Sequence, residues 1–566
     1  MSPRSTSSTA TLNAIEKTVQ DLELDNMEID KKEWQSSIDA GSLYKSRFDN
    51  LTIGQALWTF RKALFYCFCI FTGRMLEYFA MVVTGAILVN PGFIKQFGDP
   101  IGMLGSTILD PNWISAWGAV GSAGGVIAML SITWFADRFG RKLSLLLAWL
   151  FTACSMICLT TANSKGVWLV GQIFMGAGIG IIGVIVAPYG MEICPTRVRG
   201  LVLSAAIFWG AIATLLASVM MNELTKRHPL NWHLPIYATW GPVGFMLLCF
   251  LVVPESPWFY ARHGDKDNAM KALRKLYGGV PGYDFEEEYS IIVRTVEHER
   301  SQIQANKASG WTDLWKGTNG KRTISATIIS ASVQLGGFPL LYSFAPLTYA
   351  YAGFSNPFQV IVITSTVQCV VVLFMMSVFD RYGRRPFVTT SYSFQAISML
   401  LWGCMNYVDP KKGQNRFAGL YFSACLWAAT ATIAGNSQTL YVAELPAAYL
   451  RIKTGVFCYV LHAVIGIVFT FAVPRMLTTI GLKSGFVFFA TATPIAIFLW
   501  FFLPETKWRS AAEIDELYER RIPAWRWNKT RTKVEDQLDE VTRKGEAINT
   551  IARDPHEMAI RSGMPH

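Results

Sequence analysis

Three charged motifs occur twice in this chain, in the same order and roughly 250 residues apart. The first reads DRFGRK in its early copy and DRYGRR in its late copy, and each copy follows a long apolar segment. The paired copies are residues 137–142 and 380–385, residues 192–200 and 444–451, and residues 254–257 and 504–507. Such repetition predicts two equivalent halves, as in membrane bundles built from parallel repeats of six spans.

The composition indicates a chain that lies in a lipid bilayer. Hydrophobic residues make up 51%, charged residues 16%, and the mean hydropathy is +0.29. Apolar stretches of about 20 residues, the length that crosses the hydrocarbon core as a helix, recur along the chain. We place twelve spans at residues 63–89, 114–135, 143–162, 167–189, 201–222, 235–253, 323–345, 358–379, 386–406, 417–441, 455–474 and 484–503. Because backbone polar groups in lipid must be paired internally, the predicted fold class is an all-α membrane protein.

The spans divide the chain into two six-helix bundles with polar segments around them. We expect an N-terminal tail, a first bundle, a linker, a second bundle and a C-terminal tail at residues 1–61, 62–254, 255–321, 322–503 and 504–566. Amphipathic patterns predict short surface helices at 267–277, 285–300 and 511–521. These helices are expected either to be solvated connectors or to bridge the two bundles.

Basic residues predict the orientation in the membrane. With both termini cytoplasmic, the short inner loops are about twice as rich in Lys and Arg as the outer loops. The net charge of +11 therefore reflects membrane orientation, and nucleic-acid binding is not expected because no aromatic-basic recognition module is present. The N-terminus lacks the apolar core of a signal peptide. We expect an integral protein of the plasma membrane that is monomeric, without disulfides, metals or cofactors.

The motifs resemble those of the major facilitator superfamily, in its sugar-porter branch, and most closely the fungal α-glucoside:proton symporters. The resemblance covers residues 60–535 and rests on the repeated motifs, on Gln334 in span seven, and on the acidic run after residue 507. It implies a major facilitator fold and a secondary transporter of small molecules. It also implies that Gln334 contacts the substrate, since an amide both donates to and accepts from hydroxyls.

The repeated charged residues are predicted to form a cytoplasmic gate. They lie where one helix ends and the next begins, beside positive helix N-termini, so their ion pairs could form in one state and break in another. The alternative is that they only set membrane topology. One departure from the family is Thr133, at a position that usually holds Gly. The predicted gating residues are Asp137, Arg138, Arg141, Glu192, Arg199, Asp380, Arg381, Arg384, Glu444 and Arg451.

The predicted pore differs from that of proton-linked relatives. The first-span Asp of those relatives corresponds to Ala80, or to Phe79 with a one-residue shift, and the fourth span carries Gln172 where relatives have Arg or Glu. Thr214 stands at a family amide position, and Thr439 at the position of an expected aromatic residue. Glycines of the fourth span (Gly176, Gly178, Gly180) remain and allow close helix packing.

Four intramembrane polar residues are the main candidates for function. Gln334 and, more weakly, Gln438 are predicted to bind substrate, together with Gln172, Thr214 and Thr439. Glu77 is a proton-coupling candidate because a carboxylate inside a membrane is costly, but it could also form a static pair with Arg74, three residues earlier. His462 could bind a proton near neutral pH or serve as a hydrogen-bonded packing residue.

Three functions remain open from the sequence. The first is transport of a sugar or glucoside, by proton symport or by facilitated diffusion. The second is transport, in either direction, of another small organic solute such as a polyol, an organic acid or a specialised metabolite. The third is a nutrient sensor that does not transport. No enzymatic activity is expected, and the expected partners are a small-molecule substrate, the bilayer and, in the coupled case, protons.

Overall fold

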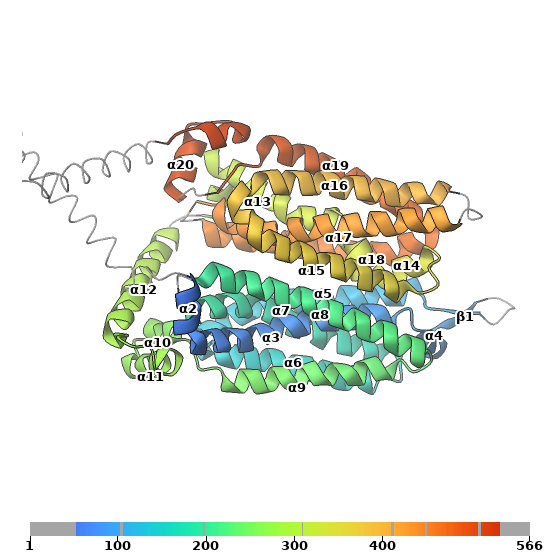
Figure 1. The fold of residues 1–566 in the computed structure, drawn as a ribbon, viewed down its shortest axis with the longest axis horizontal. Coiled ribbons are helices and arrows are strands. Elements are labelled where there is room, and N and C mark those ends of the chain that lie inside the picture. The colour runs from blue at the N-terminus through green and yellow to red at the C-terminus, as the bar shows by residue number, and fades with distance from the viewer. Residues whose placement is uncertain are drawn as a thin grey trace, which may run out of the picture.

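The computed structural model describes residues 53–101, 106–195, 198–307, 310–408, 413–447, 450–507 and 511–532. Long helices run roughly parallel through the molecule and form two halves (Figure 1). In the first half the long helices are α3 (Arg61–Ile87), α5 (Pro111–Phe139), α6 (Arg141–Thr160), α7 (Lys165–Ile193), α8 (Arg199–Arg227) and α9 (His233–Val252). The shorter elements are α2 (Ile53–Thr59), α4 (Pro91–Phe97) and two antiparallel strands, β1 (Asp99–Ile101) and β2 (Ser106–Ile108).

The second half repeats this arrangement with one broken helix. Its first segment consists of α13 (Gly317–Leu335), the π-turn η4 (Pro339–Ser343) and α14 (Ala345–Tyr351). The remaining helices are α15 (Pro357–Tyr382), α16 (Arg385–Cys404), α17 (Gly413–Glu444), α18 (Arg451–Ile480) and α19 (Ser484–Phe502), with the short turns η5 (Met405–Tyr407) and η7 (Gly481–Lys483).

The helices confirm the predicted fold class. Among the described residues, ten stretches are long and apolar enough to cross a membrane, and one of them, Lys453–Phe502, contains both α18 and α19. Of the twelve predicted spans, only that of α16 falls outside these stretches. Helix α16 is less apolar because Thr389, Thr390, Ser391 and Ser393 lie in its first half, where their hydroxyls bond to backbone carbonyls of the preceding turn. The small β1–β2 hairpin is an addition that the sequence did not indicate.

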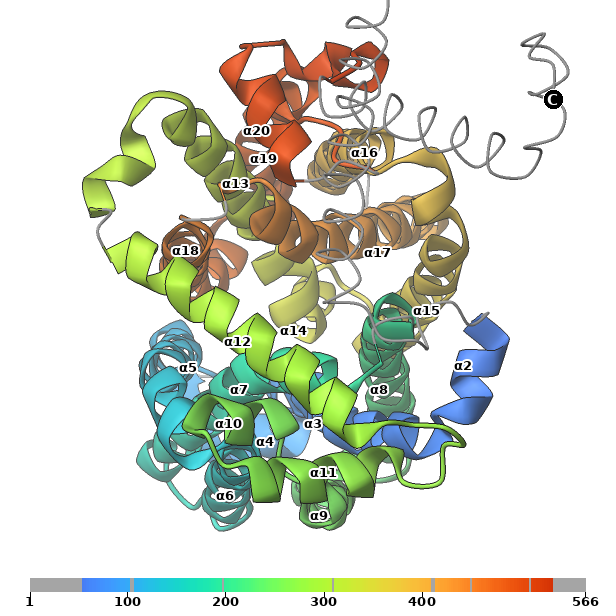
Figure 2. The same cartoon turned by 90° about the vertical axis from the view of Figure 1, so that its left-hand side faces the viewer.

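The connecting helices lie at one end of the bundle, which we call the linker face. They are α10 (Pro257–His263), α11 (Lys266–Tyr277), α12 (Phe285–Lys307), η3 (Trp311–Trp315), α20 (Ala511–Glu519) and η8 (Ala524–Lys529). The predicted surface helices at 267–277, 285–300 and 511–521 are thus present as α11, α12 and α20. Figure 2 shows α12 running diagonally across this face, from the first half toward the second. The opposite end carries β1, β2 and α4 and is called the hairpin face.

Glycines set the closest helix contact of the first half. A Cβ on Gly176 of α7 would lie 1.8 Å from the carbonyl oxygen of Gly121 on α5, and one on Gly180 would lie 2.5 Å from the carbonyl oxygen of Gly125. Gly178 meets the Thr152 hydroxyl of α6 in the same way, at 2.5 Å. The close packing predicted for these three α7 glycines is therefore confirmed, and no larger residue fits without moving the backbone.

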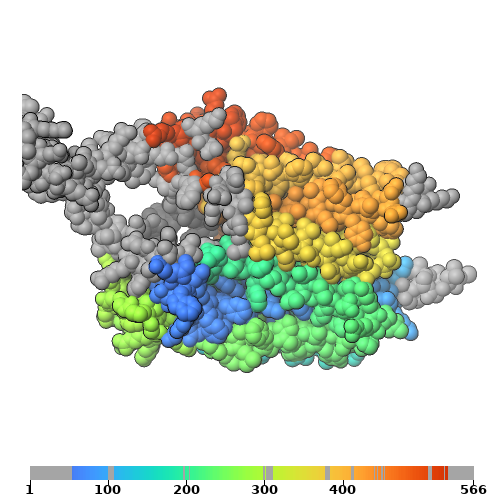
Figure 3. All heavy atoms as spheres, in the orientation of Figure 1, coloured from blue at the N-terminus to red at the C-terminus, as the bar shows by residue number. Residues whose placement is uncertain are grey.

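The two halves contact each other near the hairpin face. Helix α5 packs on α18, and α8 packs on α15. Side chains bridge the halves there: the Ser115 hydroxyl donates to the Phe471 carbonyl at 3.0 Å, and the Asn356 amide donates to the Asn222 amide oxygen at 2.9 Å. In Figure 3 the halves touch along this end and diverge toward the end that carries α2 and the linker. The structure therefore holds the hairpin side closed.

Candidate functional site

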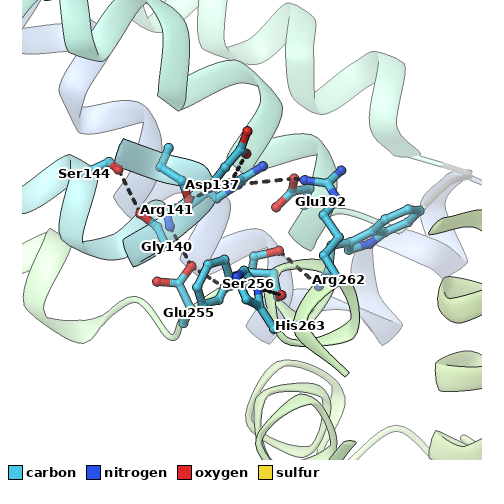
Figure 4. Close-up of polar contacts among 12 residues, drawn as sticks. Asp137, Gly140, Arg141, Ser144, Glu192, Glu255, Ser256, Arg262 and His263 are labelled. Atoms are coloured by element: carbon cyan, nitrogen blue, oxygen red, sulfur yellow. Dashed lines mark hydrogen bonds and ion pairs between the residues drawn. The ribbon is translucent and has the colours of Figure 1, made fainter. Parts of the chain in front are cut away.

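The repeated motifs form a network at the linker face of the first half (Figure 4). Gly140, with φ of +98°, ends α5 and starts α6 without a side-chain cap of its own. The Glu255 carboxylate supplies the missing acceptor and receives the backbone N–H groups of Arg141 at 2.9 Å and Lys142 at 3.0 Å. It also accepts from its neighbour Ser256 at 2.9 Å. A residue 114 positions away thus caps α6.

The charge of Glu255 is subject to two opposing effects. Burial raises its pKa, while the three N–H donors and the Arg141 guanidinium lower it, and burial dominates. The dipole of α6 stabilises a negative charge at the N-terminus of this helix. This position of Glu255 therefore suits a carboxylate that accepts hydrogen bonds from the first N–H groups of α6. Glu255 was not among the predicted site residues, although the repeat at residues 254–257 and 504–507 was the signal that pointed to it.

Arg141 connects this cap to the predicted gating acids. Its guanidinium lies 3.0 Å from Asp137 and 3.5 Å from Glu192, and Glu192 is also 3.5 Å from Arg262 of the linker helix α10. These contacts join residues of the first half to one another and to the linker. The arrangement ties the ends of α5 and α7 to α10, so that this end of the first half can move as a unit.

The second half repeats the same contacts. Glu505 accepts the backbone N–H groups of Arg384 and Arg385, both at 3.1 Å, and thereby caps α16 as Glu255 caps α6. The Arg384 guanidinium pairs with Glu444, as Arg141 pairs with Glu192. The side chains of the predicted gating residues Asp380, Arg381 and Arg451 lie outside the described residues.

The other two predicted gating residues stand apart from these pairs. The Arg138 guanidinium lies over the Phe139 ring, 5.9 Å from its centroid. Arg199 begins α8 next to Cys194, and its Nε is buried without a hydrogen-bond partner. A hydrogen bond from Cys67 and the nearby Arg199 charge lower the pKa of the Cys194 thiol. Among the described residues, neither arginine forms an ion pair like those of Arg141 with Glu192 and Arg384 with Glu444.

The break between α13 and α14 brings two aromatic residues to the interface between the halves. Gly337 has φ of +97°, a conformation that favours glycine, and the chain then turns through η4. Phe338 stacks on Tyr342 with ring centroids 4.7 Å apart. The Tyr342 hydroxyl lies 3.4 Å from the predicted substrate residue Thr214 on α8 of the other half. The sequence prediction missed this aromatic pair, which the glycines at 336 and 337 could have indicated.

Three predicted residues meet in one hydrogen-bonded cluster of the second half. The His462 Nε2 lies 3.1 Å from the Gln334 amide nitrogen, and its Nδ1 lies 2.8 Å from the Ser330 carbonyl oxygen. Gln438 donates to the Ser330 hydroxyl at 3.1 Å. Gln334 and Gln438 are buried, and His462 is half-buried. Helices α13, α17 and α18 therefore converge on two amides and one imidazole.

A charged pair lies within the first helix of the first half. Arg74 and Glu77 of α3 form an ion pair of 2.7 Å, and Arg74 also donates to the Gly183 carbonyl of α7 at 3.3 Å. The pair that the sequence offered as one of two alternatives is thus formed, and a proton-coupling role for Glu77 stays a prediction. Neighbouring Tyr78 packs against Gly210 of α8, where a Cβ would lie 2.8 Å from the ring.

Of the two other predicted substrate residues, Gln172 does not join these groups in the described structure. Gln172 lies at the crossing of α7 and α5, where its carbonyl oxygen would be 3.2 Å from a Cβ on Gly121. The side chain of Thr439 lies outside the described residues, so its role stays a prediction. Ser330, which holds both His462 and Gln438, was not predicted, because a serine inside a helix carries no sequence signal of its own.

Comparisons with known proteins match the chain over most of its length. A family model described as "Sugar (and other) transporter" matches residues 66–518. The MFS transporter fmqE of Aspergillus fumigatus is 27% identical over 444 residues, which cover 77% of this chain and 82% of that protein. The general alpha-glucoside permease of Saccharomyces cerevisiae is 24% identical over 497 residues, covering 85% of this chain and 79% of that protein.

The fold is also similar to a solved structure of the xylose transporter XylE from E. coli, in a partially occluded inward open conformation. The TM-score is 0.63 at 16% identity, and the match covers 80% of this chain and 99% of XylE. At this level of identity the likeness concerns the fold. It agrees with the arrangement of two halves described above.

Proposed function

The chain belongs to the sugar (and other) transporter family, and from this premise we propose that it carries a sugar or glucoside across a membrane by alternating access. In this mechanism two six-helix halves rock around a central binding site. Family membership makes it an integral membrane transporter; the substrate and the mode of coupling are our proposal.

The observation that carries the proposal is the hydrogen-bonded cluster of Gln334, Gln438 and His462, with the Phe338–Tyr342 pair following Gln334 on the same broken helix. Sugars expose several hydroxyls and apolar ring faces, so a sugar site needs groups that donate and accept together with an aromatic surface. Two amides, an imidazole and two stacked rings meet that need. Thr214 extends the site toward the first half, because it lies 3.4 Å from Tyr342.

We further propose that the charged pairs of the linker face take part in gating. The pairs Arg141–Glu192 and Arg384–Glu444 each join residues of one half, so they stiffen that half while the other moves past it. The halves are in contact near the hairpin face, and the relative XylE is described in an inward open form. We therefore assign the linker face to the cytoplasm, with both termini on that side, and place the protein as a monomer in the plasma membrane.

Energy coupling has two forms that the sequence left open. If Glu77 carries a proton, its pair with Arg74 at 2.7 Å must open during the cycle. If that pair is static, transport either is facilitated diffusion or uses another proton carrier. The deciding measurement is substrate-induced alkalinisation of the medium in wild type and in Glu77→Gln. Unchanged alkalinisation in Glu77→Gln excludes Glu77 as carrier, and absent alkalinisation with intact transport in wild type establishes facilitation.

The test of the proposed function is uptake of labelled solutes into cells that lack their own sugar transporters. The panel contains an α-glucoside, a hexose, a pentose, a polyol and an organic acid, each with and without a proton uncoupler. We expect uptake of at least one sugar, and Gln334→Ala should raise its KM by about five-fold or more, because a lost polar contact costs roughly 1–3 kcal/mol. Gln359→Ala, at an exposed glutamine of α15, is the matched control. Uptake of the polyol or acid alone would contradict the sugar assignment.

A further inference from the structure

The hydrogen bonds around His462 leave each ring nitrogen a defined role. Nδ1 faces the Ser330 carbonyl oxygen at 2.8 Å, much closer than the Gln438 amide nitrogen at 3.5 Å, which donates instead to the Ser330 hydroxyl. Because a carbonyl only accepts, Nδ1 carries a proton and donates. In the neutral ring Nε2 must then be the acceptor. Its partner at 3.1 Å is the Gln334 side chain, which must turn its NH₂ group toward the ring. The carbonyl oxygen of that amide is left for another partner.

Protonation of the ring reverses this requirement. In the imidazolium both nitrogens donate, and an NH₂ group facing Nε2–H would place two donors against each other. Gln334 can avoid this only by rotating its amide by half a turn. The oxygen then accepts from Nε2, and the NH₂ group points the other way. The Ser330 contact at Nδ1 stays the same in both states, so the ring itself need not move.

The surroundings leave room for that rotation at one point. Gly466 of α18 faces the Gln334 amide, and a Cβ there would lie 3.1 Å from its nitrogen and 3.5 Å from its carbon. The other neighbours are held in place: Gln438 donates to the Ser330 hydroxyl, and that hydroxyl donates to the Cys458 carbonyl at 3.1 Å. The amide of Gln334 is thus the part of the cluster that is able to adjust.

Few charged groups face the ring. The groups of α13 and α17 that contact it, the Ser330 carbonyl and the Gln334 and Gln438 amides, are uncharged at all relevant pH values. Helix α19 contains no charged residue. The other ionisable residues of α18 are Arg451, Lys453, Cys458, Tyr459 and Arg475. The elements packed against α18 contribute Asp137 and Arg138 on α5, Asp313 on η3, Lys321 and Arg322 on α13, Tyr342 on η4, Tyr349 and Tyr351 on α14, Arg416, Tyr421, Cys425, Tyr441 and Glu444 on α17, and Lys483 on η7, and Arg74 of α3 interacts with Tyr459. In the described structure the hydrogen bonds to the ring come from Ser330, Gln334 and Gln438.

We propose that His462 is a positioning residue that couples proton binding to substrate recognition by setting which end of the Gln334 amide faces the substrate. When the ring is neutral, the Gln334 carbonyl oxygen faces the substrate as an acceptor. When the ring is protonated, the Gln334 NH₂ group faces the substrate as a donor. This inference rests on the proposed function only in assigning Gln334 to the substrate. Proton binding at His462 and substrate binding are then coupled: if protonation changes the affinity for substrate, bound substrate changes the affinity of His462 for the proton by the same factor.

The first experiment measures the ring without any substrate. Protein labelled with ¹⁵N-histidine is studied by NMR, and His462 is assigned as the signal lost in His462→Gln. In wild type at pH 8 we expect the tautomer with the proton on Nδ1. In Gln334→Glu, which offers only acceptors, both ring nitrogens should stay protonated at that pH. A neutral ring protonated on Nε2 in wild type would overturn the proposal, whether or not the protein transports sugar.

The second experiment measures substrate affinity between pH 5.5 and 8, with a sugar from the uptake panel that wild type binds. We expect the Kd of wild type to change at least five-fold over this range and that of His462→Gln to stay constant. Gly466→Ala should shrink the change because it crowds the amide, and Gly455→Ala, with no atom within 4 Å of its Cβ, should preserve it. A pH dependence that persists in His462→Gln, or that disappears in Glu77→Gln, would refute the coupling.

Discussion

Removing the Glu255 carboxylate should destabilise the first half by an amount that the structure allows us to work out. In Glu255→Ala three backbone N–H groups, those of Arg141, Lys142 and Ser256, lose acceptors at 2.9–3.0 Å. Loss of an N-cap costs about 1 kcal/mol, and a partly buried donor left unpaired costs about 1–3 kcal/mol. Since water can reach this face, we expect a loss of roughly 2–4 kcal/mol in the free energy of unfolding.

The glutamine variant separates hydrogen bonding from charge. In Glu255→Gln the remaining oxygen still accepts from Arg141 and Ser256, and only the contact to Lys142 is lost. Burial raises the pKa of Glu255, so a neutral side chain also avoids part of the cost of burying a charge. We therefore expect Glu255→Gln to lose less than half as much stability as Glu255→Ala.

The assay is reversible unfolding in mixed detergent micelles, with SDS as denaturant. Glu505→Ala is an internal replicate, because Glu505 accepts three backbone N–H groups at 3.1 Å in the second half. Glu223→Ala is the control: this residue is about half exposed, forms loose pairs with Lys226 and Arg227 at 3.6 and 3.8 Å, and accepts a long hydrogen bond from the Asn222 amide at 3.4 Å, so its loss should cost well under 1 kcal/mol. If Glu255→Ala is no less stable than Glu223→Ala, the cap is not a stabilising contact.

Three further outcomes are expected. Gly176→Ala should abolish the yield of monodisperse protein on size exclusion, because its Cβ would lie 1.8 Å from a backbone oxygen of α5, whereas Gly183→Ala, whose nearest neighbour is a flexible methionine end at 3.7 Å, should fold. Asp137→Asn and Asp380→Asn should increase thiol labelling of cysteines introduced at the linker face; unchanged labelling in both would leave these acids a role in topology only. Tyr518→Ala should speed proteolysis of the C-terminal segment, because the Arg322 guanidinium lies 4.6 Å from the Tyr518 ring centroid, while Tyr518→Phe should behave as wild type.

The sequence by itself determined the properties that depend on local composition and on repetition. Apolar stretches long enough to cross a bilayer predicted the spans, and helices are found where these were placed. The duplicated motifs predicted two equivalent halves, and Glu255 and Glu505 make the same contacts in each. The spacing of Arg74 and Glu77 on one helix face offered their pairing as one alternative, and the pair is present. Each of these inferences needs only the position of a residue within its own segment.

Only the tertiary structure decided which polar residues act together. Gln334 and His462 are 128 residues apart, and Gln438 comes from a third helix, so no local pattern relates them. Their meeting depends on how α13, α17 and α18 are rotated and on the absence of a side chain at Gly466. Likewise the break at Gly337 decides where Phe338 and Tyr342 lie. Hydropathy places a helix in the membrane, but packing against its neighbours sets its rotation, and that rotation assembles the site.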